Sequence, residues 1–208
     1  MRTVDPAKHR ERRRQILGAA ARLFAEKGFE RTTTAEICRA AGMSPGNLFH
    51  YFPSKRAIFA AVLTDDDGGD RSGRLAAART AADPLAALFD TVDLLAEAAL
   101  DPLSPPLVME AMVMAYRDPE LAESLGADND EEHAALTDLL TRAVAAGQVD
   151  PGLDPRNTAT WIQTLIGALY TSAATDPAFV PAEQLPTLHL IVRRFLRAEA
   201  GAGTSGGG

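Results

Sequence analysis

The sequence predicts an all-α protein, with an N-terminal three-helix helix-turn-helix domain and a C-terminal helical domain. Leu and Ala are abundant, runs of β-branched residues are scarce, and apolar residues recur at helical spacing. In addition, a short polar residue repeatedly precedes a proline and an apolar segment, as at Asp83-Pro84 and Asp154-Pro155. Such pairs are typical of helix starts, because the polar side chain caps the helix and proline suits its first position.

The stretch from Thr33 to Phe52 is expected to form the helix-turn-helix. Thr33 and Glu36 make a capping box that begins one short helix, and Gly42 ends it because glycine tolerates the left-handed conformation. Ser44 then caps a second helix that has proline at its first position. Two helices joined by a short glycine-containing turn can place the second helix in the DNA major groove.

The second helix of this motif carries side chains that suit DNA recognition. Asn47 can pair with adenine and Phe49 can touch a thymine methyl, while neighbouring polar groups and Lys55 can contact phosphates. A plain helical hairpin with an ordinary surface is the alternative. The expected DNA-binding residues are Thr32, Thr33, Ser44, Pro45, Gly46, Asn47, Phe49, His50, Tyr51 and Lys55.

Residues 32–55 read TTTAEICRAAGMSPGNLFHYFPSK. This order resembles the DNA-binding domain of the tetracycline-repressor (TetR) family of bacterial regulators, and the resemblance covers about residues 10–62. Pro45 stands where the family often has lysine, Asn47 where it often has threonine, and Cys38 where it usually has a small residue. These departures leave the expected fold intact and leave the operator sequence open.

Charge is distributed unevenly along the chain, whose formal net charge is −7. Residues 1–60 carry twelve Lys and Arg against five Asp and Glu, whereas residues 61–208 carry nine against twenty-three. The first segment therefore has a balance of +7 and the second a balance of −14. A basic end on an acidic body is typical of a DNA-binding protein, and a merely solvated basic helix is the alternative.

The sequence shows no signal for a membrane or for secretion. No apolar stretch is long enough to span a bilayer, and no apolar core follows the basic N-terminal segment, as a signal peptide would require. The single cysteine, Cys38, excludes an intramolecular disulfide and fits a reducing cytoplasm. We therefore expect a cytoplasmic protein in which Cys38 is a small buried residue, with a thiol sensor as the alternative.

The domain organisation follows from these signals. A mobile arm over residues 1–9 precedes the helix-turn-helix domain of residues 10–53, and a flexible tail over residues 201–208 follows the regulatory and dimerisation domain of residues 54–200. The stretch DDDGGDRSG, residues 65–73, predicts a break; a metal-binding loop is a weaker alternative because the spacing of a calcium loop is missing. Beyond it, helices are expected over residues 74–82, 84–100, 105–116, 119–125, 129–146, 155–175 and 181–198.

The last two of these helices carry apolar residues on more than one face. A helix that is apolar over so much of its surface must be buried on two sides, and the resemblance implies that a second copy of the chain covers one of them. A monomer that buries both sides internally is the alternative. The expected interface residues are Ile162, Leu165, Ile166, Leu169, Leu188, Ile191, Val192 and Phe195.

A further set of residues could line a cavity for a small molecule. Methionine is flexible and polarisable, and small-molecule sites are mostly apolar with few polar groups. The resemblance implies such a cavity within residues 84–175, and simple core packing is the alternative. The candidate lining residues are Phe89, Met109, Glu110, Met112, Tyr116, Trp161 and Thr164.

These features predict a sequence-specific DNA-binding transcriptional regulator. The expected form is a dimeric repressor that a largely apolar small molecule releases from a near-palindromic operator of double-stranded DNA. An architectural DNA-binding protein without a ligand response is the alternative. The histidines show no metal-ligand spacing, and the chain has no GxGxxG motif or P-loop. We therefore expect no catalytic residue, no metal, no cofactor and no membrane partner.

Overall fold

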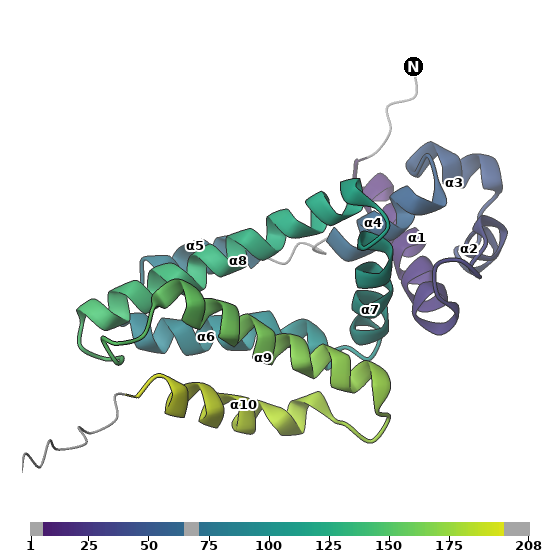
Figure 1. Ribbon diagram of the computed structural model, residues 1–208. Coiled ribbons are helices and arrows are strands. Elements are labelled where there is room, and N and C mark those ends of the chain that lie inside the picture. The colour runs from purple at the N-terminus through teal and green to yellow at the C-terminus, as the bar shows by residue number, and fades with distance from the viewer. Residues whose placement is uncertain (1–5, 65–70, 198–208) are drawn as a thin grey trace, which may run out of the picture. The chain divides into compact units, whose positions relative to one another are not determined.

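The computed structural model describes residues 6–64 and 71–197, and this part of the chain contains helices and no strand, which confirms the all-α prediction (Figure 1). A single 3-10 turn, η1, follows α6 directly. The elements are α1 (Pro6–Lys27), α2 (Thr34–Ala40), α3 (Pro45–Tyr51), α4 (Lys55–Thr64), α5 (Arg71–Arg79), α6 (Pro84–Glu97), η1 (Ala98–Leu100), α7 (Ser104–Ala115), α8 (Pro119–Ala145), α9 (Pro155–Thr175) and α10 (Pro181–Phe195).

The chain divides into two compact units, each made of two segments. The helix-turn-helix unit comprises Met1–Gly69 and Asp101–Leu125, and the C-terminal unit comprises Asp70–Leu100 and Gly126–Gly208. This division differs from the boundary expected near residue 54, because α4 and α7 both pack against α1. The helix whose methionines suggested a ligand cavity, α7, is thus part of the unit that holds the helix-turn-helix.

Aromatic side chains from α1 and α4 form the centre of the helix-turn-helix unit. The Phe24 ring lies 5.1 Å from Phe59 in an edge-on arrangement and 5.7 Å from Phe29, and such pairs stabilise a core by ~0.5–1.5 kcal/mol beyond their burial. Leu48 of α3 and Phe52, the residue directly after this helix, are both buried in this core. One side of α3 is therefore anchored in the core, as the four-residue spacing of Leu48 and Phe52 predicts.

The ends of α1, α2 and α3 follow local sequence signals. Thr33 caps α2: its hydroxyl oxygen accepts from the Glu36 N–H at 3.2 Å, while the Glu36 carboxylate accepts from the Thr33 N–H at 2.9 Å. Gly28 and Gly42 have φ values of 78° and 62°, a conformation that favours glycine. Ser44 occupies the N-cap of α3 but makes no capping hydrogen bond, so only its position is as expected.

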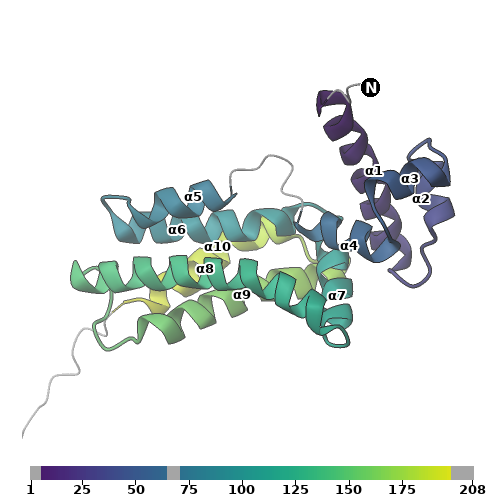
Figure 2. The same ribbon diagram turned by 90° about the horizontal axis from the view of Figure 1, so that it is seen from above.

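The C-terminal unit is a bundle in which α6, α8 and α9 run along a common direction (Figure 2). Asp83 caps α6 by accepting from two backbone N–H groups, and Asp154 caps α9 by accepting from the Asn157 N–H at 2.7 Å. Both caps were predicted from the polar–proline pairs. The core of the bundle includes the buried side chains Leu88, Val92, Leu136, Leu139, Leu140 and Ile162.

Two helices expected at residues 119–125 and 129–146 are one continuous helix, α8. The intervening residues include Gly126 and a run of acids, and neither of these interrupts the helix. A single interior glycine costs only about 1 kcal/mol relative to alanine, and the acidic side chains Asp128 and Asp130 are exposed to water. The prediction of a break was therefore wrong.

Two other starts differ from prediction. α7 begins at Ser104, one residue before the expected start at residue 105. The Asp101 carboxylate accepts from the Leu103 N–H at 3.0 Å and stabilises the turn before the helix. α5 begins at Arg71, three residues earlier than expected, and ends at Arg79. The break and the metal-loop alternative predicted around residues 65–70 lie outside the described residues.

Candidate DNA-binding surface

α3 presents a polar and aromatic surface to solvent. Leu48 is completely buried, while Asn47 and His50 are exposed and Phe49 is 48 % exposed. Tyr51 is half-buried at the end of the helix. One short helix and its N-cap therefore bring together seven of the ten predicted DNA-binding residues: Ser44, Pro45, Gly46, Asn47, Phe49, His50 and Tyr51.

The first turns of α1 support this helix, which the sequence did not predict. The ring of His9 stacks on Tyr51 with the centroids 4.7 Å apart and the planes at 30°. The guanidinium of Arg13 lies 4.8 Å from the centroid of Phe52. A mobile arm was expected up to residue 9, but α1 already begins at Pro6. No local spacing signals these contacts, because they join residues that are distant in sequence.

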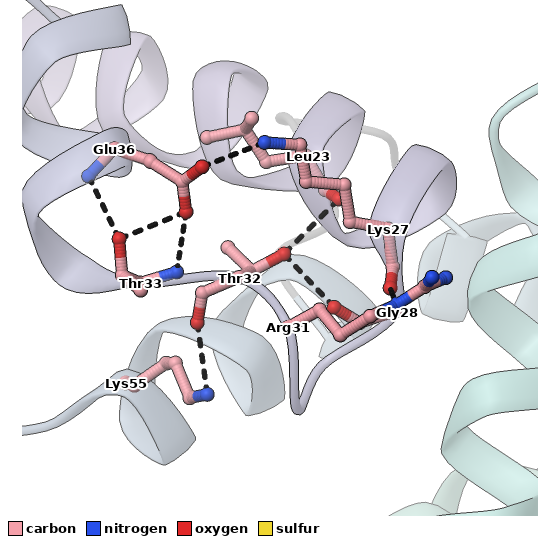
Figure 3. Close-up of polar contacts among 8 residues, drawn as sticks. All are labelled: Leu23, Lys27, Gly28, Arg31, Thr32, Thr33, Glu36 and Lys55. Atoms are coloured by element: carbon pink, nitrogen blue, oxygen red, sulfur yellow. Dashed lines mark hydrogen bonds and ion pairs between the residues drawn. The ribbon is translucent and has the colours of Figure 1, made fainter.

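Thr32 supports the turn between α1 and α2 from within (Figure 3). Its side chain is completely buried, and its one O–H is shared between two carbonyl acceptors, Gly28 at 2.9 Å and Leu23 at 3.1 Å. The Thr32 side chain therefore stabilises the turn from inside, and its predicted contact with DNA stays a prediction. Thr33 is exposed, but its hydroxyl donates to the Glu36 carboxylate at 2.8 Å as part of the capping box.

Lys55 holds the same turn from α4. Its ammonium group donates to the carbonyl oxygens of Phe29 at 2.7 Å, Thr32 at 2.9 Å and Glu30 at 3.3 Å. It also lies 4.3 Å from the centroid of the Phe29 ring. An ammonium group has three donors, and Lys55 directs them to three backbone carbonyls. Its predicted contact with phosphate stays a prediction.

An ion pair links α1 to α2 beside this turn. The Lys27 ammonium lies 2.6 Å from the Glu36 carboxylate, as Figure 3 shows. This charged hydrogen bond, followed by those from the N–H and hydroxyl of Thr33, lowers the pKa of Glu36 to about 2. Hydrogen bonds to the charged form of a carboxyl favour ionisation, so Glu36 remains an anion and keeps the capping box formed at neutral pH.

Glu110 approaches the turn from α7. Its carboxylate accepts from the Phe29 N–H at 2.8 Å, and a Cβ at Gly28 would lie only 3.3 Å from it. Any side chain at position 28 would also be strained, because φ is 78°. Glu110 was expected to contact a ligand, and the structure instead gives it a backbone partner in the helix-turn-helix unit.

The other predicted ligand residues are divided between the two units. Tyr116 is 91 % exposed and Met112 is 61 % exposed on the surface of the helix-turn-helix unit. Trp161 is 54 % exposed on α9, and Thr164 donates to a carbonyl of its own helix. Four of the seven residues belong to the helix-turn-helix unit and three to the C-terminal unit, so neither unit brings the set together.

The predicted interface residues differ in how far they are buried within the single chain. Five of its residues are at most 5 % exposed and pack in the core of their own chain: Ile162, Ile166, Leu169, Leu188 and Val192. These side chains offer little surface to a second copy. Ile191 is 44 % exposed, and Leu165 and Phe195 are half-buried, so these three are accessible.

Within residues 6–64 and 71–197, no group of three or more His, Cys, Asp and Glu is placed to hold a metal ion. None of the helices in this part of the chain is long and apolar enough to cross a membrane.

An exposed second helix, anchored on a three-helix core and lying in the basic part of the chain, defines a DNA-binding protein of the helix-turn-helix class. Residues 16–62 match the family described as "Bacterial regulatory proteins, tetR family". Residues 91–201 match "BetI-type transcriptional repressor, C-terminal". The chain belongs to the tetR family of bacterial regulatory proteins, whose members are transcriptional regulators and not enzymes.

Individual relatives agree with this assignment. The chain is 33 % identical to the HTH-type transcriptional repressor Rv1474c of Mycobacterium tuberculosis over 138 residues, which are 66 % of this chain and 69 % of that protein. The structure of Salmonella enterica GusR matches with a TM-score of 0.68 and 27 % identity, over 95 % of this chain and 100 % of GusR. A putative regulator from Saccharomonospora viridis in complex with choline shares the fold, with a TM-score of 0.76 and 20 % identity over 91 % and 99 % of the two chains.

Proposed function

We propose that the protein is a dimeric repressor in the cytoplasm that binds a near-palindromic operator and is released from it by a small molecule. The observation that carries this proposal is the exposed surface of α3. Its N-terminal turn and its aromatic residues face water, while Leu48 and Phe52 fix the helix to the core behind them. Recognition helices of this class enter the major groove with their N-terminal residues toward the bases.

The exposed side chains of α3 divide into two roles. Asn47 reads a base edge, because its amide can both donate to and accept from adenine, and Phe49 contacts a thymine methyl. Ser44, His50 and Tyr51 have donors that suit phosphate oxygens. The stacking of His9 on Tyr51 restricts the tyrosine ring before DNA is bound.

A second copy of the chain covers the accessible apolar residues of α9 and α10. Trp161 and Ile191 are 54 % and 44 % exposed, which is a large apolar area to leave in water. A single helix-turn-helix contacts only a few base pairs, whereas a two-fold dimer presents two recognition helices to half-sites separated by about one helical turn, ~34 Å, or a multiple of it. Dimerisation thus increases the affinity for DNA and requires an operator with two-fold related half-sites.

Release requires a ligand that prefers one of two conformations, since equal affinity for both would shift nothing. The protein with choline from Saccharomonospora viridis supports small-molecule control by analogy of fold. Within the helix-turn-helix unit, Arg56 of α4 lies 2.8 Å from Asp118 and 2.9 Å from Glu120, and Lys55 of α4 holds the α1–α2 turn. A shift of α4 would therefore move the turn that leads into α2.

Selection from a pool of random DNA duplexes, followed by sequencing, tests this proposal. A near-palindromic site with fixed half-site spacing is expected. Salt-sensitive binding without sequence preference would instead favour the architectural alternative, because phosphate contacts alone carry no sequence information. The selected operator then serves as the probe for ligands: a compound that leaves operator affinity unchanged at saturation is not the effector.

A further inference from the structure

A pocket of about 200 Å³ lies between α6 and α10 in the C-terminal unit. α6 contributes Leu85 and Phe89, and the turn after α8 contributes Gln148. The last turn of α10 and the residues that follow it contribute the remainder of the lining: Arg193, Leu196 and Arg197. Phe89 is the member of this set that the sequence predicted for a ligand site.

The apolar part of the pocket is built from side chains that pack against the core of the unit. Leu196 is 3 % exposed, and Leu85 and Phe89 pack against the core of the unit. The guanidinium of Arg193 lies 4.7 Å from the centroid of the Phe89 ring. His189 packs against the same ring at 5.3 Å, and its Nε2 lies 2.6 Å from the Asp93 carboxylate. The aromatic ring and one guanidinium are therefore positioned together without a ligand.

The positive charge of the pocket is not neutralised by the described part of the chain. No described carboxylate lies within 4.0 Å of the guanidiniums of Arg193 or Arg197, although residues 61–208 carry a large excess of acids. By contrast, Arg74 of the same unit lies 2.9 Å from Glu97. The nearby Asp83 carboxylate accepts from the Gln148 amide at 3.0 Å and also caps α6.

Stabilisation of the helix end does not account for this arrangement. Basic residues in the last turn of a helix interact favourably with its dipole, and Arg194 fills that role as well as Arg193 does. Arg194 is not among the lining residues. The dipole therefore explains basic residues at the end of α10, but not why Arg193 and Arg197 both line one pocket, with the Arg193 guanidinium over Phe89.

We infer that this pocket binds a small carboxylic acid with one flat apolar ring. Guanidinium groups match carboxylates in a planar, two-pronged geometry, and the ring of the ligand would pack against Leu85 and Phe89. The volume corresponds to roughly six or seven water molecules, which suits one ring with its carboxylate. It is smaller than the ~300–1,000 Å³ of sites for drug-sized ligands.

Calorimetric titration of the full-length protein with benzoate tests the inference, with benzamide as the uncharged analogue. We expect one saturable benzoate site per chain and markedly weaker binding of benzamide. Arg193→Gln should weaken benzoate binding by about tenfold or more, because it removes the guanidinium held over Phe89. Arg194→Gln is the matched control, since it removes the same charge from the same turn and should leave benzoate affinity unchanged.

Three outcomes would overturn the inference. These are the absence of saturable binding at millimolar benzoate, equal affinities for benzoate and benzamide, and equal losses in the two arginine variants. Thermal unfolding of Arg193→Gln establishes that the variant is folded, and Arg197→Gln provides a second test if it is not. Operator binding does not depend on this pocket in the proposed function, so failure here leaves that proposal intact.

Discussion

The carboxylate of Glu110 accepts a hydrogen bond from the backbone N–H of Phe29 at 2.8 Å, although the two residues are 81 positions apart in sequence. The carbonyl of the same residue, Phe29, accepts from the Lys55 ammonium at 2.7 Å. An anion on α7 and a cation on α4 thus hold opposite backbone groups of one residue. The α1–α2 turn is positioned by both helices, and it leads directly into the helix-turn-helix.

Glu110→Ala should destabilise the helix-turn-helix unit by roughly 1–2 kcal/mol. The Phe29 N–H loses an ionised acceptor, and hydrogen bonds to charged groups are worth about 1.5–3 kcal/mol when well shielded from water. Glu110 is partly exposed, which places the expected loss toward the lower end. Urea unfolding measures the change.

Glu110→Gln keeps an acceptor oxygen and should lose less stability than Glu110→Ala. The matched control is Glu123→Ala, which removes an exposed acid on α8 and should leave the unfolding midpoint in place. If Glu110→Ala and Glu123→Ala were equally mild, the hydrogen bond to Phe29 would have no measurable role.

Lys55→Ala should lower thermal stability and should change the salt dependence of operator binding only slightly. A lysine that neutralises a phosphate contributes about −0.9 to the slope of log affinity against log salt, but the Lys55 ammonium is already bonded to three carbonyls. Parallel melting and binding curves over a range of salt concentrations measure both effects. If the slope fell by a full unit and the melting temperature did not change, Lys55 would be assigned to a phosphate contact.

Asn47→Ala should relax sequence preference at one base pair of each half-site without changing the fold. A good amide–adenine pair is worth ~1–3 kcal/mol of discrimination, and Asn47 is exposed, so little packing is lost. Comparing the sequences that the variant and the unmodified protein select from random duplexes measures the effect. If the variant selected the same site as the unmodified protein, Asn47 would not take part in base recognition.

The contribution of Glu36 to stability should disappear in acid. Its pKa in the folded protein is about 2, below the ordinary value of 4.5, so the folded state binds this proton less readily than the unfolded state does. The stabilisation is therefore complete above about pH 4.5 and is lost as pH falls toward 2. Urea midpoints of the protein and of Glu36→Gln should differ at pH 6 and converge toward pH 2, whereas a constant difference would contradict the assignment.

Ile191→Glu should separate the proposed dimer into folded monomers. Ile191 is 44 % exposed in the single chain, so the charge does not disturb the core but would be buried without a partner in the dimer. Sedimentation velocity measures the state of association. Tyr116→Glu alters an exposed residue of the helix-turn-helix unit and should leave association unchanged. A dimer that survives Ile191→Glu would place the interface elsewhere.

Features encoded by neighbouring residues were predictable from the sequence. The capping box of Thr33 and Glu36 and the cap at Asp154 depend on side chains within three positions of their partners. α9 has the bounds that its polar–proline start predicts. The exposed side chains of α3 follow from the burial of Leu48 and Phe52, which the four-residue spacing already indicated.

Contacts between distant segments were not predictable in the same way. Nothing near Glu110 or Lys55 in the sequence indicates that both bind the turn around Phe29, because the contacts form only after α4 and α7 pack against α1. The predicted interface residues illustrate the same limit of the sequence. Periodicity shows that Ile162 and Val192 are buried, but it does not show whether the burial is within one chain or between two.

The only cysteine of the chain, Cys38, is 4 % exposed in the core of the helix-turn-helix unit. A thiol reagent can reach this side chain only when the unit opens, so the labelling rate counts opening events rather than surface encounters. The labelling rate of Cys38 therefore reports how often the DNA-binding unit unfolds locally. Any molecule that binds only the closed form must lower this labelling rate in proportion to its occupancy.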